Sequence, residues 1–153
     1  MLFRSNKQSI QAILNISIST SLEKYLGCPI INGRVNKETF KDIIISTQNQ
    51  LTKWKASAIS QEGRATLIRA NLAAKPNHVM QSFMLPSSIH QDLNKKNKNF
   101  FWNKGEHHSP LIGWDRICKP KNNGGINLRK AEGMNKAMQM KLLWKLLIDP
   151  SNI

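Results

Sequence analysis

Acidic residues are scarce in this sequence. It contains 9 Asp+Glu against 23 Lys+Arg among 153 residues, which gives a formal net charge of +14. No two acidic residues are adjacent, and no glycine-rich phosphate loop, GxSxG elbow or HExxH motif occurs. Two-metal phosphoryl transfer needs carboxylates close enough to hold both ions. We therefore expect no active site of the chain's own and no enzymatic activity.

Cysteines and long apolar runs are also few or missing. Cys28 and Cys118 lie far apart and neither belongs to a CxxC pair, so a disulfide framework or a zinc site is not expected. We expect no cofactor and no small-molecule substrate. No apolar run approaches the ~20 residues that cross a bilayer, and the first residues turn polar too early for a signal peptide. A membrane partner is therefore not expected either.

Positive charge is the strongest feature that is present. The excess is spread along the whole sequence and forms no polybasic tail. A distributed excess suits a folded surface laid along a phosphate backbone, because neutralised phosphates release condensed counterions. The alternative is a solvated basic surface without a partner. Of these two, the pattern favours nucleic acid as the partner.

The apolar periodicity predicts a mainly α fold. A short helix could run to about Leu14, and Asn36 and Ser60 are good N-caps for two longer helices. Pro76 should end the second of these, and segment 77–84 could be helix or strand. The main helices are expected at about 36–56, 60–75, 87–103 and 131–148. The last has so wide an apolar surface that it is either well buried or packed on something outside this sequence.

Two short β elements are predicted beside the helices. Residues 24–31 contain strand-type side chains interrupted by Gly27 and Pro29, which indicates a strand or hairpin with a sharp bend. A second β element is expected near 111–129, with a strand at 111–118, a turn at 119–125 and a short extended piece after it.

Basic side chains on the predicted helices are candidates for phosphate contacts. Such contacts position a protein on a duplex without reading its sequence. The alternative is that each belongs to a solvated helical face. The candidates are Arg64, Arg69, Lys75, Lys95, Lys96 and Lys98. Four tryptophans could stack on bases, although packing between elements is favoured for each of them: Trp54, Trp102, Trp114 and Trp144.

A series of blocks in this order resembles the reverse transcriptases of plant LINE-type (non-LTR) retrotransposons, whose members are also named as ribonuclease H proteins. The resemblance covers about residues 20–148. It is carried by LEKYLGCPIINGRV, LTKWKASAISQEGRATLIRANLAAKP, VMQSFMLP, FFWN, GWDRICKPKNNGGINLR and MNKAMQMKLLWKLL.

The resemblance implies a layout of three parts. Residues 1–34 would be the end of the polymerase palm, with the YLG block and so Lys24 and Tyr25 near the primer. Residues 35–104 would be a helical, thumb-like domain that closes over the template–primer duplex. Residues 105–153 would be a connection segment ending in a helix. The catalytic aspartates of the family lie upstream of the YLG block, so this chain would lack them, and a nuclear location is implied.

Two acidic residues depart from the family's pattern. Members commonly carry Gly where Glu23 stands and Ala where Glu62 stands. An acidic residue beside a primer-facing surface would oppose phosphate and weaken binding. The resemblance and the positive charge together lead us to expect a catalytically incomplete polymerase fragment that binds RNA, DNA or their hybrid, independently of sequence. The alternative is an interaction remnant that packs on the polymerase domains it lacks and has no activity of its own.

Overall fold

The computed structural model divides the chain into two compact units, residues 1–34 and 35–153. The structure describes residues 10, 13–15, 24–25, 27–31, 36–74, 76–103 and 112–149, without the side chains of 72–74.

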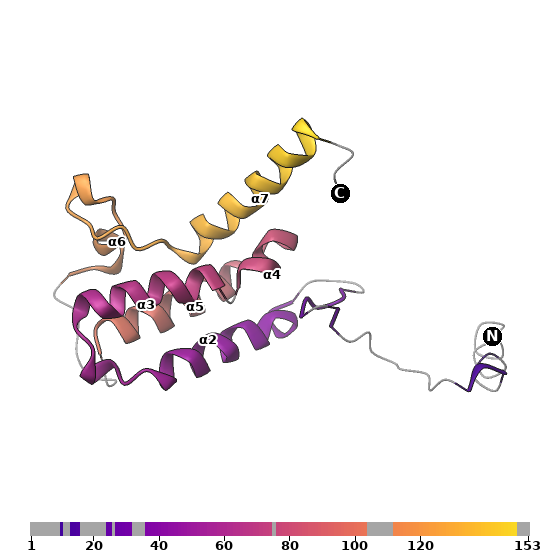
Figure 1. The fold of residues 1–153 in the computed structure, drawn as a ribbon, viewed down its shortest axis with the longest axis horizontal. Helices are drawn as coiled ribbons and strands as arrows, with labels where there is room; N and C mark the ends of the chain where they lie inside the picture. The colour runs from indigo at the N-terminus through magenta and orange to yellow at the C-terminus, as the bar shows by residue number, and fades with distance from the viewer. Residues whose placement is uncertain are drawn as a thin grey trace. The chain divides into compact units, whose positions relative to one another are not determined.

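Helices account for nearly all regular structure in the described part of the second unit (Figure 1). They are, in order, η1 (Glu38–Phe40), α2 (Lys41–Lys53), η2 (Ala56–Ala58), α3 (Gln61–Ala74), α4 (Asn77–Ser82), α5 (Ser87–Phe101), α6 (Trp114–Ile117), η3 (Lys121–Asn123) and α7 (Ala131–Ile148). The mainly α prediction is confirmed, and the open segment 77–84 is resolved as helix α4.

The strand predicted at 24–31 is not found in the residues described there, whereas the predicted sharp bend is present. Tyr25 and Cys28 exchange two backbone hydrogen bonds of 2.9 Å, which close a tight turn. Gly27 lies in this turn with φ of 81°, a left-handed conformation that glycine adopts without strain. Strand-type side chains form a strand only where another strand pairs with them, and none pairs with this turn in the described residues.

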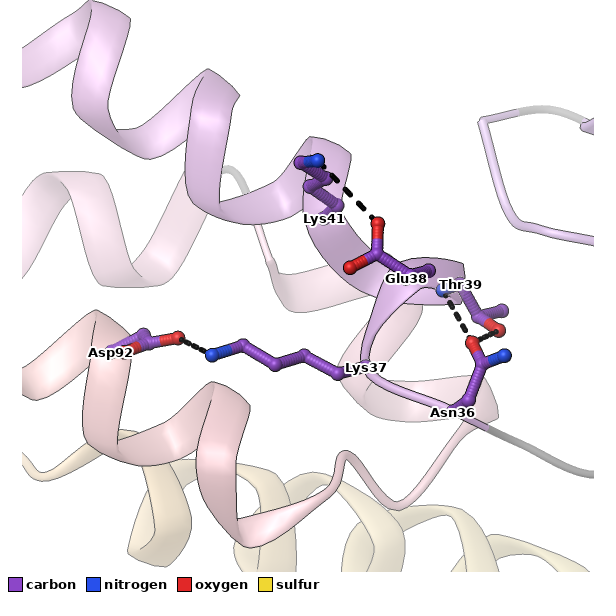
Figure 2. A network of polar contacts seen from close by, with 6 residues as sticks. All are labelled: Asn36, Lys37, Glu38, Thr39, Lys41 and Asp92. Carbon is purple, nitrogen blue, oxygen red and sulfur yellow. Dashed lines mark hydrogen bonds and ion pairs between the residues drawn. The ribbon is translucent and has the colours of Figure 1, made fainter.

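Side-chain caps set the starts of the first two long helical segments. The Asn36 carboxamide oxygen accepts hydrogen bonds from the Thr39 amide (3.0 Å) and hydroxyl (2.9 Å), as Figure 2 shows. The Ser60 hydroxyl accepts a bond from the Gly63 amide at 3.2 Å. Both caps satisfy amides that a helix cannot pair internally. The two predicted N-caps are therefore confirmed.

Helix α5 is the centre of the second unit. It contacts α2, α3 and α7, and its buried face includes Ile89, Leu93 and Phe100. Trp54 packs against Phe100, and the centroids of the two rings are 5.9 Å apart. A salt bridge of 2.8 Å from Lys37 to Asp92 joins the segment before α2 to α5 (Figure 2). The core is thus built from helices on several sides of α5.

Asn135 fixes the first half of α7 against the rest of the unit. Its amide nitrogen donates to the carbonyls of Met80 (2.7 Å) and Phe83 (2.9 Å). Its carbonyl oxygen accepts from the Leu85 amide at 2.8 Å and lies 3.0 Å from His90 Nε2. The oxygen can accept from His90 only if Nε2 carries the proton. With that tautomer, this fully buried amide uses its whole hydrogen-bonding capacity.

The β element predicted near 111–129 is also wrong where the structure describes it. Trp114 and Ile117 lie on one face of the single-turn helix α6 and are both buried. The predicted turn at 119–125 is present, with η3 followed by Gly124 at φ of 73°. At Gly125 a side chain would collide with the Lys119 backbone. Two backbone bonds, Ile126 to Ile117 and Asn127 to Lys119, close the loop without forming a strand.

The predicted helix at 131–148 coincides with α7. Its first turns are buried through Ala131, Met134 and Asn135, whereas Trp144 and Leu147 are exposed at 67% and 77%. None of the helices in the described ranges is long and apolar enough to cross a membrane.

Candidate nucleic-acid interface

A groove rimmed by basic side chains lies where α3, the end of α5, α6 and η3 meet. Its volume is about 610 Å³. We call it the basic groove: Arg69, Arg116 and Lys121 are its cations, and its apolar lining includes Phe101, Trp102, Ile112, Ile117 and Ile126. All three cations are exposed. Glu62 lies in the same lining and reduces the positive potential there.

Arg69 keeps most of its hydrogen-bonding capacity for a ligand. One Nη2–H donates to the Ile126 carbonyl at 2.6 Å, which ties α3 to the loop after η3. A guanidinium has five N–H donors in a planar fork, so the others can meet phosphate oxygens. The bond to Ile126 orients this fork at the rim of the groove.

Trp102 brings an aromatic surface to the same groove. Its ring packs edge-on against Phe101, with centroids 5.0 Å apart. Its buried indole N–H has no hydrogen-bond partner. A donor with no accessible surface cannot be reached by a ligand in the groove, so Trp102 contributes its ring surface there and not this N–H. The packing predicted for Trp102, Trp54 and Trp114 is present, whereas Trp144 is exposed.

Arg64, a predicted phosphate contact, serves the fold. Its Nε donates to the Phe101 carbonyl at 2.8 Å, and its Nη1 donates to the carbonyls of Ala56 (2.8 Å) and Ile59 (2.9 Å). The side chain is half-buried. Three of its five donors are therefore spent on backbone oxygens. These three hydrogen bonds favour a structural role for Arg64, which does not line the basic groove.

The three lysines of α5 diverge around the helix. Lys95 is exposed, while Lys96 and Lys98 are half-buried. Lys96 lines a cavity with Thr52 and Trp54 on the α2 side, whereas Lys98 is close enough to Asp115 to lower the pKa of that carboxyl. At about 100° per residue, Lys96 and Lys98 point about 160° apart. They cannot form one patch, although they are neighbours in sequence.

The remaining predicted contacts are not joined to the groove. Lys75 lies outside the described residues. Lys24 and Tyr25 belong to the first unit, where Tyr25 is 70% exposed. Of the predicted set, only Arg69 lines the basic groove.

Arg116 and Lys121 were missed by the sequence analysis. They stand in a segment that was predicted as strand and turn, and no periodicity connects them with Arg69. A signal was present in the run from Arg116 to Lys121, which holds three basic residues in a short, glycine-bounded loop. Loops of this kind often carry binding residues.

Most described carboxylates are paired with single lysines. Glu38 pairs with Lys41, Asp92 with Lys37, Asp115 with Lys130 and Glu132 with Lys136. The hydrogen bond from Lys130, at 2.6 Å, holds the pKa of Asp115 below its usual value and raises the pKa of Lys130. In the described ranges, no group of three or more His, Cys, Asp or Glu residues could hold a metal ion.

The half-buried thiol of Cys118 is unreactive at neutral pH. Burial raises its pKa to about 11, and the nearby Lys130 opposes this shift only in part. A thiol with so high a pKa is almost wholly protonated near pH 7, and the thiolate is the nucleophilic form. Cys118 is therefore not a candidate nucleophile.

Over 129 residues, or 82% of the chain, the sequence is 33% identical to an Arabidopsis thaliana protein named "Putative ribonuclease H protein". The chain spans only about 20% of that protein's length. No protein-family profile matches the chain, and no solved structure is similar to it. The chain is thus similar, over 82% of its length, to part of a plant protein named for ribonuclease H.

Proposed function

We propose that this chain is part of a LINE-type retrotransposon reverse transcriptase and binds the backbones of RNA, DNA or their hybrid through the basic groove. The observation that carries the proposal is the convergence of Arg69, Arg116 and Lys121 on one groove next to Trp102. Cations next to an aromatic surface suit a phosphate backbone with unpaired or terminal bases.

Charge and similarity both support this function. The net charge of +14 provides long-range attraction to a polyanion. The relative's name refers to a nuclease of nucleic acid, and the chain is 33% identical to it over the shared residues. The helical second unit is consistent with a thumb-like role beside a template–primer duplex.

The chain supplies no catalytic centre in this proposal. The described carboxylates of Glu38, Asp92, Asp115 and Glu132 are each held by a lysine and come from different elements. Two-metal catalysis would require carboxylates that converge on shared ions. The polymerase domains of a longer protein would have to provide that pair.

Binding to a labelled RNA–DNA hybrid, titrated with salt, tests the proposal. The affinity should fall steeply with salt and depend little on sequence. Each neutralised phosphate contributes about 0.9 to the slope of log K against log salt. The double variant Arg116→Gln/Lys121→Gln should therefore lower the magnitude of the slope by up to about 2.

A control variant separates the groove from overall charge. Lys141→Gln/Lys145→Gln removes the same charge from exposed positions on α7 and should leave the slope nearly unchanged. Glu62→Gln should strengthen binding, because it removes the acidic group of the groove. Equal effects of the two double variants would refute the groove as the binding site.

An interaction module is the second candidate function. It is favoured by the exposed apolar side chains of the second half of α7, which include Met140, Leu143, Trp144 and Leu147. Exposed apolar patches of this kind usually mark contact sites.

A further inference from the structure

Helix α7 has a second apolar face, opposite the one that docks on α4 and α5. The docked face carries Ala131, Met134 and Asn135. The other face carries Gly133, Ala137, Met140, Trp144 and Leu147, all exposed. Steps along this second face alternate between four and three residues. This is the spacing at which two helices pack side chains into each other's gaps.

The size of the side chains changes along this stripe. Gly133 and Ala137 are the small end, and Trp144 and Leu147 are the large end. A Cβ built on Gly133 meets no atom within 4 Å, so there is open space in front of it. A helix that approaches the small end can therefore come close, and it can bring large side chains with it.

A groove lies beside the small end of the stripe, between α7 and the α6 segment. Its volume is about 660 Å³, and Gly133, Met134 and Ala137 form its α7 wall. Leu128 and Cys118 are among the residues that line it from the α6 segment. In Figure 1 α7 leaves the body of the unit at an angle to the α6 segment, and its far half extends free. Asp115, Lys119, Arg129 and Lys130 also line the groove. It thus offers room for a partner's side chains, with its apolar surface on the α7 wall and at Leu128.

We propose that α7 pairs antiparallel with α7 of a second copy of this chain, about a two-fold axis near Met140. In this arrangement the large end of each copy, Trp144 and Leu147, lies on the small end of the other. The same residues then enter the groove beside Gly133 and Ala137. A two-fold pair uses the same surface of both copies and forms a closed dimer. Because side-chain size increases along the stripe, the small end of one copy fits the large end of an antiparallel copy.

The charges on α7 permit this pairing. Lys136 and Lys141 lie on opposite flanks of the stripe, since they are five residues, or about 500°, apart around the helix. In an antiparallel pair the lysines of α7 in one copy therefore do not all lie opposite the lysines of α7 in the other. The net charge of +14 on each copy still opposes association. Added salt should therefore strengthen the pair, whereas it weakens nucleic-acid binding.

Sedimentation of the nucleic-acid-free full chain tests the pair. We expect a monomer–dimer equilibrium at micromolar concentration, with the dimer fraction rising from 0.1 to about 0.5 M salt as screening increases. Leu147→Glu should abolish the dimer. Leu142→Glu, the same substitution on the opposite side of the helix, should leave it. A monomer at every salt concentration would overturn the proposal.

The variant Gly133→Leu distinguishes the proposed pair from non-specific hydrophobic association. The substitution makes the stripe more apolar, and the open space at Gly133 lets the folded chain accept it. Unspecific association would increase. The proposed pair should be lost, because leucine blocks the position that receives the partner's large side chains. A stronger dimer in Gly133→Leu would contradict the proposal.

Cysteine crosslinking reports the orientation. In a Cys28→Ser/Cys118→Ser background, Met140→Cys lies near the two-fold axis and should form a disulfide between copies. Leu147→Cys should not, because antiparallel pairing separates its two copies. Crosslinking of both variants would indicate a parallel pair and contradict the proposal.

A membrane surface would give a different result. If the stripe inserted into anionic phosphatidylserine vesicles, the chain would stay monomeric in their absence. Leu147→Glu would then reduce co-sedimentation with the vesicles. That outcome would overturn the two-fold pair in favour of a lipid surface.

Discussion

Three buried asparagines of this chain show how differently one residue type can be used. Asn71, Asn97 and Asn135 are all fully buried. Asn135 satisfies both ends of its amide with partners from α4, the linker after it, and α5. Asn71 and Asn97 have neither end satisfied. A buried amide stabilises only when it is paired, so the three positions should respond differently to substitution.

Asn135→Ala should destabilise the second unit by about 2–4 kcal/mol. The Leu85 amide and the Phe83 carbonyl would lose their partner in a buried region, whereas the Met80 carbonyl would keep its bond from Gln139. Urea unfolding would measure the change in free energy. The control is Asn122→Ala, at an exposed position, which should change the stability by less than about 0.5 kcal/mol. Equal effects of the two substitutions would contradict the role given to Asn135.

At the scale of elements, Arg64 joins three segments. Its guanidinium holds both ends of η2, through Ala56 and Ile59, and the last residue of α5, Phe101. The last carbonyls of a helix lack partners within the helix and carry its negative dipole end. A cation at that place compensates for both.

Arg64→Lys should cost about 2 kcal/mol of stability, because an ammonium cannot reproduce the fork that reaches three carbonyls. The charge is retained, so the loss would report geometry. Arg116→Lys is the matched control, since Arg116 is exposed and its substitution should be nearly neutral. Chemical denaturation of both variants measures the difference, and an unchanged midpoint for Arg64→Lys would refute its linking role.

The helices could be predicted from the sequence because their signals are local. Asn36 and Ser60 cap nearby amides, and the apolar spacing of α7 lies within one segment. The strand at 111–118 was wrong because Trp114 and Ile117 suit a strand by type but share one face of a helical turn. Only packing on the core, which the sequence does not display, decides between the two.

The basic groove could be predicted only in part. Arg69 was identified from its helix, yet its neighbours in space, Arg116 and Lys121, follow from the loop that Gly124 and Gly125 permit. The lysines of α5 show the opposite error, in which residues close in sequence were grouped although they lie apart in space. Sequence proximity grouped Lys96 with Lys98, and helical rotation separates them.

At the scale of the whole molecule, the chain matches only part of a longer relative. It spans about 20% of its Arabidopsis relative. In the function proposed above, its charge would bind nucleic acid, while a longer protein would supply the chemistry. Binding and catalysis should therefore be separable in this protein.

Primer extension checks this separation. With a primed RNA template, deoxynucleotides and magnesium, the purified chain should incorporate no nucleotide above a protein-free control. The physical reason is that two-metal catalysis needs carboxylates that converge on both ions, and no acidic cluster in the described ranges could hold a metal ion. Binding to the same primed template, measured in parallel, shows that the chain is folded and competent. Incorporation above the control would refute the proposal.

The anchoring of α7 at one end has a mechanical consequence. Asn135 clamps the base of the helix, and the tip at Ile148 lies thirteen residues further on, or about 20 Å at 1.5 Å per residue. A tilt of a few degrees at the clamp moves the tip by an ångström or more. The side-chain amides of Asn135 and Gln139, which donate to carbonyls between Met80 and Phe83, thus set the direction of the far half of α7. A substitution deep in the protein could redirect Trp144 and Leu147 without touching either.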